Sequence, residues 1–188
     1  MMDYIKTYDN VLSIDVCLKI IQKFEKHLDQ HVNTILEDHR SFTEINLNNY
    51  SEWKNEILNL LVPTFQTYIA RYKKDMNIDD NVWPDKYGFE QIRMKRYLPN
   101  DIDEFKFHVD VMNHESARRF LVCFIYLNDV LEGGETAFQY NRNEEMIDKI
   151  KPQVGRMLIF PPFWTHPHVG TKPISGTKFI IGTYLHYL

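Results

Sequence analysis

The chain has 188 residues, of which 44% are hydrophobic and 26% are charged, with a formal net charge of -4. This length suits one domain with one core, and the hydrophobic content excludes a disordered chain. The mildly acidic balance gives no general attraction to nucleic acid or to a membrane surface. The polar N-terminus lacks the apolar stretch of a secretory signal, and no apolar run approaches the roughly 20 residues that span a bilayer. We therefore expect a cytoplasmic protein.

The first half of the chain has the pattern of helices. Residues 14–28 place apolar side chains at three- and four-residue spacing, which is typical of one helix face, and Ser13 is a suitable N-cap. A second helix is expected over residues 51–74, with a kink or a break at Pro63. We interpret residues 1–88 as a helical buttress for the rest of the domain.

After residue 88 the pattern changes to apolar segments separated by polar turns. These segments are rich in Phe, Ile, Val and Tyr, which favours strands. Strands are expected at residues 89–98, 105–112, 119–127, 136–140, 156–163 and 178–187. Many strands without intervening helices favour a sandwich, a barrel or a jelly roll. We predict a single α+β, mainly β, domain over residues 1–188, with residues 89–188 as its core.

The segment "FKFHVDV" carries the first candidate for a metal site. Because side chains alternate along a strand, His108 and Asp110 should lie side by side on one face, and Phe105 and Val109 on the other. An imidazole and a carboxylate in this arrangement can bind one metal ion from adjacent positions. Two histidines and one carboxylate form the ligand set of non-haem Fe(II) oxygenases, so a second histidine is needed.

The segment "THPHVG" offers that second histidine. It contains His166 and His168, and the chemistry of the residues alone suits either. Lys178 begins the last expected strand, ten residues after His168. There it would lie deep in a barrel beside apolar walls, where an ammonium group needs an anionic partner.

Together these motifs resemble those of the 2-oxoglutarate- and Fe(II)-dependent dioxygenases, and among them the prolyl 4-hydroxylase branch. The His-Val-Asp motif, a distal histidine and a lysine ten residues later stand in the order of that family. The segment "QIRMKRYLPND" resembles its tyrosine-bearing strand, "FIYLNDVLEGGETAF" its Gly-Gly-Glu-Thr segment, and "VGRMLIFPP" the strand before the distal histidine. The likeness covers residues 89–188 well and the first 88 loosely.

The resemblance implies a fold and a set of ligands. The fold is a double-stranded β-helix, a cupin-like jelly roll, with N-terminal supporting helices. The implied iron ligands are His108, Asp110 and the distal histidine, and Lys178 would bind the 5-carboxylate of 2-oxoglutarate. In the family the distal histidine stands ten residues before the lysine and begins a His-x-Gly pattern. His168 matches both features, so we favour it over His166 as the third ligand.

Further pocket residues are expected on the same basis. Tyr97 matches the tyrosine that contacts the 5-carboxylate, and Thr183 and Tyr126 lie on strands that line the co-substrate pocket. Candidates for contact with substrate or for support of the metal ligands are His166, Arg118, Trp164 and Glu135.

The implied reaction is hydroxylation of a C–H bond with Fe(II), 2-oxoglutarate and O2, releasing succinate and CO2, with ascorbate as a further cofactor. The expected substrate is a prolyl residue in a peptide or protein, and the alternative is a free amino acid or another small molecule. Nucleic acid is not expected, because the last strand lacks the arginines of the nucleic-acid demethylases in this superfamily. Two other classes stay open, namely a non-catalytic jelly-roll binding module and a cupin-like enzyme that does not use 2-oxoglutarate.

Overall fold

The structure, a computed structural model, describes residues 4–36, 38–140 and 145–188. Its helical segments are α1 (Ile14–Lys26), the 3-10 turn η1 (Leu28–Gln30), the 3-10 turn η2 (Leu47–Asn49), α2 (Ser51–Trp53), the π turn η3 (Lys54–Leu58), α3 (Asn59–Asp75) and the 3-10 turn η4 (Asp80–Val82). Its strands are β1 (Lys6–Tyr8), β2 (Val32–Leu36), β3 (Arg40–Asn46), β4 (Tyr87–Phe89), β5 (Arg93–Tyr97), β6 (Glu104–His108), β7 (Arg119–Tyr126), β8 (Thr136–Phe138), β9 (Asp148–Ile150), β10 (Arg156–Phe160), β11 (His168–Gly170) and β12 (Lys178–Tyr187).

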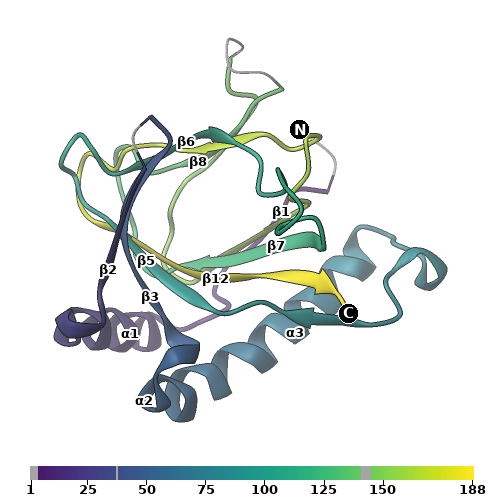
Figure 1. The fold of residues 1–188 in the computed structure, drawn as a ribbon, viewed down its shortest axis with the longest axis horizontal. Helices are drawn as coiled ribbons and strands as arrows, with labels where there is room; N and C mark the ends of the chain where they lie inside the picture. Colours follow the sequence, from purple (N-terminus) through teal and green to yellow (C-terminus); the bar gives the residue numbers. More distant parts are fainter. Residues whose placement is uncertain (1–3, 37, 141–144) are drawn as a thin grey trace.

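The strands form one curled antiparallel sheet. In the described part of the chain their order is β1-β10-β7-β12-β5-β3-β6-β11-β8-β9, with β2 beside β3 and β4 beside β12. The curl brings β6 and β8 over the layer made by β5, β7 and β12, and helices α1 and α3 cover the outer face of that layer (Figure 1). The predicted mainly β jelly roll with supporting helices is confirmed. None of the described helices has the length and apolar character needed to cross a membrane.

Helix α1 follows the expected pattern at its start and on its buried face. The Ser13 side chain accepts a hydrogen bond from the Val16 backbone N–H, as an N-cap does. Cys17, Ile20 and Phe24 are fully buried against the sheet. Cys17 and Cys123 are both buried free thiols.

The second helical region differs from the expectation at Pro63. That proline lies inside α3 without ending it, and the irregularity is instead the π turn η3, which ends directly before α3. A proline ring crowds the carbonyl of the residue four positions earlier, here Asn59. The π turn η3 ends at the residue before Asn59, and α3 continues past the proline.

The first 88 residues also supply strands, so their description as a helical buttress was incomplete. Strands β2 and β3 form a hairpin, and β3 pairs with both β5 and β6. Strand β3 thereby joins the lower layer of the curled sheet to the upper one. Its residues Arg40 and Glu44 reach the groove in front of the candidate site as a result.

Strand β6 is shorter and less regular than expected. It ends at His108, and its pairing with β11 contains a bulge, because His168 lies opposite His108 whereas Gly170 lies opposite Phe105. One extra residue of β6 thus fits between the two pairs. The expected alternation is wrong for Phe105, which falls on the same side as His108 and stacks on its ring at a centroid distance of 3.5 Å.

Candidate metal and co-substrate site

Three side chains meet at the point where β6 and β11 pair. His108 ends β6, Asp110 follows two residues later, and His168 begins β11. One potential ligand atom from each lies within 4.8 Å of the others. The Asp110 carboxylate is 3.8 Å from Nε2 of His108 through Oδ1 and 3.5 Å from Nε2 of His168 through Oδ2. We call these three residues the metal cluster.

Both imidazoles of the metal cluster are held in one orientation. Nδ1 of His108 lies 2.7 Å from the carbonyl oxygen of Lys106, and Nδ1 of His168 lies 3.0 Å from that of His166. A carbonyl oxygen only accepts, so each Nδ1 carries the proton and each Nε2 keeps a free lone pair. Burial, helped by the proximity of His168, lowers the pKa of His108 to about 3, so its ring is neutral at physiological pH.

The carboxylate of Asp110 is only partly satisfied within the described structure. Oδ1 accepts a hydrogen bond of 2.6 Å from the Tyr184 hydroxyl, whereas Oδ2 is buried without a hydrogen-bond partner. Burial opposes ionisation of Asp110, but His168, His108 and the tyrosine hydroxyl outweigh it and lower its pKa. A buried anionic oxygen without a partner is costly, and a cation among the three ligand atoms removes that cost. The residues present therefore fit Fe(II), for which two imidazoles and one carboxylate are a known ligand set.

Lys178 lines the same cavity as the metal cluster. Its side chain is buried, at 2% exposure, and its ammonium nitrogen lies 5.1 Å from the ring centre of Tyr97 and 5.8 Å from that of Tyr126. No carboxylate of the described residues forms an ion pair with it, and burial lowers the pKa of Lys178 to about 7. An anionic group entering the cavity would hold this lysine in its charged form.

Between Lys178 and the metal cluster the cavity has apolar walls. They are formed by Val122, Phe124, Phe160 and Ile180. A short molecule with an anionic group at each end that bound to the lysine and to the metal cluster would lie against these walls, which would keep water from it. We call this space the inner cavity.

Several of the other expected residues lie at or behind the inner cavity. Tyr97 lines it and is paired with Lys178 across β5 and β12. Tyr126 does not line it, but its hydroxyl donates a hydrogen bond of 2.7 Å to Thr136, which does. The Glu135 carboxylate accepts a hydrogen bond from the Thr171 hydroxyl. Tyr126 and Glu135 thus contact other residues and do not themselves line the inner cavity.

The structure does not place Thr183 in the inner cavity. Its hydroxyl donates to the carbonyl of Glu90, because alternate residues of β12 point to opposite faces of the sheet. Lys178 and Tyr184 share the face that looks into the cavity. Tyr184 was not among the residues expected from the sequence, although its even spacing from Lys178 was a usable signal.

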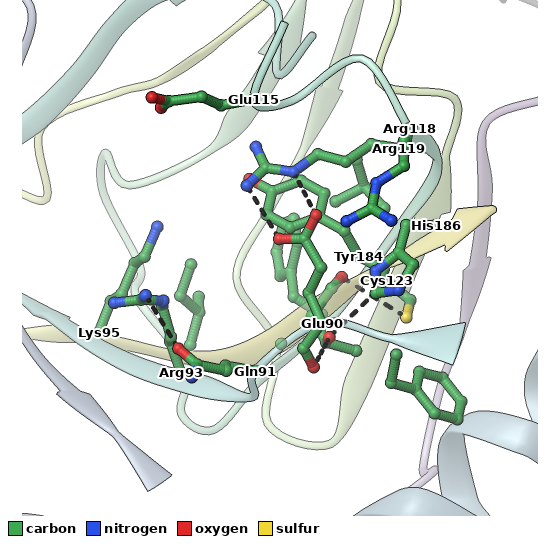
Figure 2. A pocket seen from close by; sticks show the side chains of 16 residues that line it. Glu90, Gln91, Arg93, Lys95, Glu115, Arg118, Arg119, Cys123, Tyr184 and His186 are labelled. Atoms are coloured by element: carbon green, nitrogen blue, oxygen red, sulfur yellow. Dashed lines mark hydrogen bonds and ion pairs between the residues drawn. The ribbon is translucent and has the colours of Figure 1, made fainter. Parts of the chain in front are cut away.

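The remaining candidates lie outside the inner cavity. His166 lines a separate pocket, where its ring is 2.8 Å from the Thr165 hydroxyl. Trp164 is 81% exposed and lines neither space. Arg118 is exposed and lines a groove in front of the cavity (Figure 2).

Two adjoining grooves lead to the metal cluster. The first is bounded by parts of β5, β7 and β12 and by the loop before β7. Arg119 forms an ion pair of 2.8 Å with Glu90 on its wall, and the pair is drawn in Figure 2. The second runs past β3 and includes His108 and Asp110 in its lining. The volumes are about 480 Å³ and 380 Å³, respectively. We refer to both together as the outer groove.

A sequence model described as the 2OG-Fe(II) oxygenase superfamily matches residues 92–186, which include the metal cluster and Lys178. The chain belongs to this superfamily. The predicted enzyme class, a 2-oxoglutarate-dependent dioxygenase, is confirmed, and so are Fe(II) and 2-oxoglutarate as cofactors. It is therefore not the non-catalytic binding module considered above, nor an enzyme that works without 2-oxoglutarate.

Solved structures share the fold along nearly the whole chain. The viral collagen prolyl hydroxylase of Paramecium bursaria Chlorella virus-1, in complex with 2OG, is 21% identical with a TM-score of 0.68, over 99% of this chain and 97% of that one. A Pseudomonas putida prolyl-4-hydroxylase is 13% identical with a TM-score of 0.68, over 99% and 94%. A Trichoplax adhaerens prolyl hydroxylase, in complex with a peptide fragment of hypoxia inducible factor, is 17% identical with a TM-score of 0.75, over 98% and 84%. No curated protein sequence matches the chain.

Proposed function

We propose that this dioxygenase hydroxylates a prolyl residue in a peptide or protein, while 2-oxoglutarate is oxidised to succinate and CO2. The observation that carries the proposal is that the metal cluster and Lys178 line one inner cavity, which shares His108 and Asp110 with the outer groove. The prolyl substrate is supported by the fold shared with the three prolyl hydroxylases.

The proposal gives each residue of the site a role. His108 and His168 would hold Fe(II) through Nε2, and Asp110 through its carboxylate, with Tyr184 fixing the carboxylate from behind. Lys178 would bind the 5-carboxylate of 2-oxoglutarate. Fe(II) with bound 2-oxoglutarate supplies the activation of O2 that C–H hydroxylation requires. The chain's own work is to bind and orient both substrates and to exclude water with the apolar walls.

The outer groove supports a peptide rather than a buried small molecule as substrate. It is open to solvent along two connected stretches, and its floor reaches His108 and Asp110. An extended peptide could lie in it with one side chain directed at the metal cluster. The Trichoplax enzyme, whose fold is similar, was solved with a peptide fragment.

The reaction itself tests the proposal. Purified protein with Fe(II), 2-oxoglutarate and O2 is incubated with proline-containing peptides, with free proline and with other free amino acids, with and without ascorbate. We expect succinate release coupled to the gain of one oxygen atom on a prolyl residue of a peptide, measured by mass spectrometry. Oxygen incorporation into free proline alone, or into no prolyl residue, would rule out the proposed substrate. The dependence on ascorbate decides whether that cofactor is used, which remains a prediction.

Replacement of Lys178 tests the co-substrate role. Lys178→Met keeps the length of the side chain but removes the charge that faces the carboxylate of 2-oxoglutarate. We expect the KM for 2-oxoglutarate to rise by about 100-fold or more, because the loss of a buried charge-assisted hydrogen bond costs about 3 kcal/mol or more. The control is Lys19→Met on helix α1, an exposed lysine on the far side of the sheet. An unchanged KM in Lys178→Met would remove this lysine from the co-substrate site.

A histidine pair tests the metal ligands. His168 points Nε2 at Asp110, whereas His166 lines a separate pocket. We expect His168→Ala to weaken Fe(II) binding by about 100-fold or more, and His166→Ala to change it much less. Anaerobic titration with Fe(II), or with Co(II) as a spectroscopic probe, measures both. Equal losses in the two variants would contradict the assignment of a single ligand in this segment.

A further inference from the structure

Lys95 is a second lysine at the metal cluster, and neither the sequence analysis nor the proposed function uses it. It lies on β5, lines the inner cavity and lines both parts of the outer groove. Its ammonium nitrogen is 4.5 Å from the ring centre of Phe42 and 5.7 Å from that of Phe105. Since the Phe105 ring stacks on His108, the charge of Lys95 lies beside the metal cluster.

Three of the carboxylates around Lys95 are engaged elsewhere, and a fourth, Glu115, lies across the groove without an ion pair to Lys95 among the described residues. Glu44 is its cross-strand neighbour, but the Glu44 carboxylate forms an ion pair of 3.0 Å with Arg93. Asp110 belongs to the metal cluster, and Glu90 is paired with Arg119. Among the described residues, Lys95 has contacts with aromatic rings and no ion-pair partner. The Lys95 residue is half-buried, and an ammonium group that loses part of its hydration without gaining an anionic partner is costly.

A second cation in the same part of the groove is also incompletely satisfied. Arg40 lies over the Phe105 ring at 5.6 Å, and its buried Nε atom has no hydrogen-bond partner in the described structure. Arg40 and Lys95 thus flank one aromatic ring next to the metal cluster. The two cations lie close together although the chain as a whole has a net charge of -4.

The position of Lys95 separates it from the 2-oxoglutarate site. On β5 it precedes Tyr97 by two residues, and Tyr97 is the cross-strand partner of Lys178 in the lining of the inner cavity. Lys178 lines the inner cavity but not the outer groove, whereas Lys95 lines both. Figure 2 shows the Lys95 side chain standing in the outer groove, across from Glu115. Lys95 is therefore placed where the substrate rather than the co-substrate enters.

We propose that Lys95, assisted by Arg40, binds a carboxylate of the substrate, and that the enzyme selects peptides with an Asp or Glu side chain close to the hydroxylated prolyl residue. This inference rests on the proposed function. A lysine binds a carboxylate as a compact point charge, and the nearby guanidinium adds hydrogen-bond donors in a fixed plane. The bound carboxylate provides the anionic partner that both cations lack.

The first test compares peptides of one length and one sequence around the proline. They differ only at one position within two residues of the proline, which is Glu, Gln or Lys. The Gln peptide is made in two forms, with a free and with an amidated C-terminus. We expect kcat/KM to be about tenfold or more higher for Glu than for Gln with both ends blocked, and lowest for Lys. Equal values for the blocked Glu and Gln peptides overturn the inference. A preference for the free C-terminus alone would assign the carboxylate to the chain end, and overturns the side-chain assignment.

The second test replaces the lysine. Lys95→Gln should abolish the preference for Glu over Gln, mainly through KM, and Lys95→Arg should retain it. Lys19→Gln on α1 makes the same change of charge outside the groove and should keep the wild-type preference. Thermal unfolding shows whether each variant is folded. A rise in the KM for 2-oxoglutarate equal to the rise for the Glu peptide would make Lys95 a co-substrate ligand and overturn the inference.

The two proposals fail in different ways. If Glu and Gln peptides are hydroxylated equally well, prolyl hydroxylation stands and the carboxylate site does not. If 2-oxoglutarate is consumed but no prolyl peptide of the set gains oxygen, the prolyl substrate is wrong, and the peptide selectivity proposed for Lys95 is wrong with it.

Discussion

Asp110 depends on Tyr184 for its position in the metal cluster. The hydroxyl of Tyr184 donates to Oδ1 and leaves Oδ2 directed at Nε2 of His168. His108 and His168 are fixed by backbone carbonyls that no side-chain replacement removes directly. Of the three groups that hold the metal ligands in place, only Tyr184 acts through its side chain. Its replacement therefore tests how much this support contributes to metal affinity.

We expect Tyr184→Phe to weaken Fe(II) binding by about 10- to 100-fold, the usual effect of removing a group that supports a metal ligand. Without the hydroxyl, Oδ1 loses its partner and the carboxylate is free to rotate. Tyr187→Phe is the control, because Tyr187 is 48% exposed at the end of the same strand. Anaerobic Fe(II) titration of both variants measures the effect, and equal affinities would show that Tyr184 does not position the carboxylate.

The sequence was informative about the residues whose chemistry stands out. His108, Asp110, His168 and Lys178 were selected by residue type and spacing, and the structure brings the first three together and places the lysine in the same cavity. Lys95 was not selected, because a lysine in a strand is ordinarily a solvated side chain. What distinguishes it is the loss of solvent and of ion-pair partners, which only the folded arrangement reveals.

At the scale of the elements, the expected strands after residue 88 include β5, β6, β7, β8, β10 and β12, whereas the hairpin of β2 and β3 in the first half was missed. Strand β3, "RSFTEIN", contains Ser, Thr, Glu and Asn, yet it pairs with β2, β5 and β6, and Ser41, Phe42 and Thr43 are buried. The polar groups there have partners, since the Ser41 hydroxyl donates to Asp103. Local composition does not report such partners, which come from residues distant in the sequence. The bulge in β6 was missed for the same reason, since it arises from pairing with β11.

The close approach of β12 to β7 leads to a prediction at this scale. Gly182 lies opposite Phe124, and a Cβ atom added to it would be 2.3 Å from the Cβ of Phe124 and 2.7 Å from the backbone oxygen of Cys123. Neither atom is the end of a flexible side chain, so the strands themselves must move. We expect Gly182→Ala to lower the free energy of unfolding by about 1–3 kcal/mol, as overpacking does.

Gly176→Ala provides the matched control for that prediction. It lies in the loop before β12, and an added Cβ atom would meet nothing within 4 Å. Chemical denaturation of both variants compares them directly. If Gly182→Ala were as stable as Gly176→Ala, the contact between β12 and β7 would be looser than the structure shows.

For the whole molecule, the curl of the sheet has an electrostatic consequence. It encloses the metal cluster so that His108 and the Asp110 side chain are almost entirely removed from solvent. Burial holds the pKa of His108 at about 3, against an ordinary value of 6.5, and the surrounding groups hold the pKa of Asp110 below its ordinary value. Folding therefore favours the form of both residues that binds a metal ion, before any metal is present.

The same enclosure predicts how the stability of the metal-free protein depends on pH. Below pH 6.5 the unfolded chain binds a proton at His108, whereas the folded chain does not until about pH 3. The free energy of unfolding should therefore fall as the pH is lowered through this window, with a contribution from His108 that approaches about 1.4 kcal/mol per pH unit. The lowered pKa of Asp110 acts in the same direction at the acidic end, because stability present above its ordinary value is lost as it is protonated. Urea unfolding with a chelator at pH 7.5, 6 and 5 measures the slope. His108→Gln should make it shallower, and an equal slope in the variant would show that His108 is protonated in the folded state.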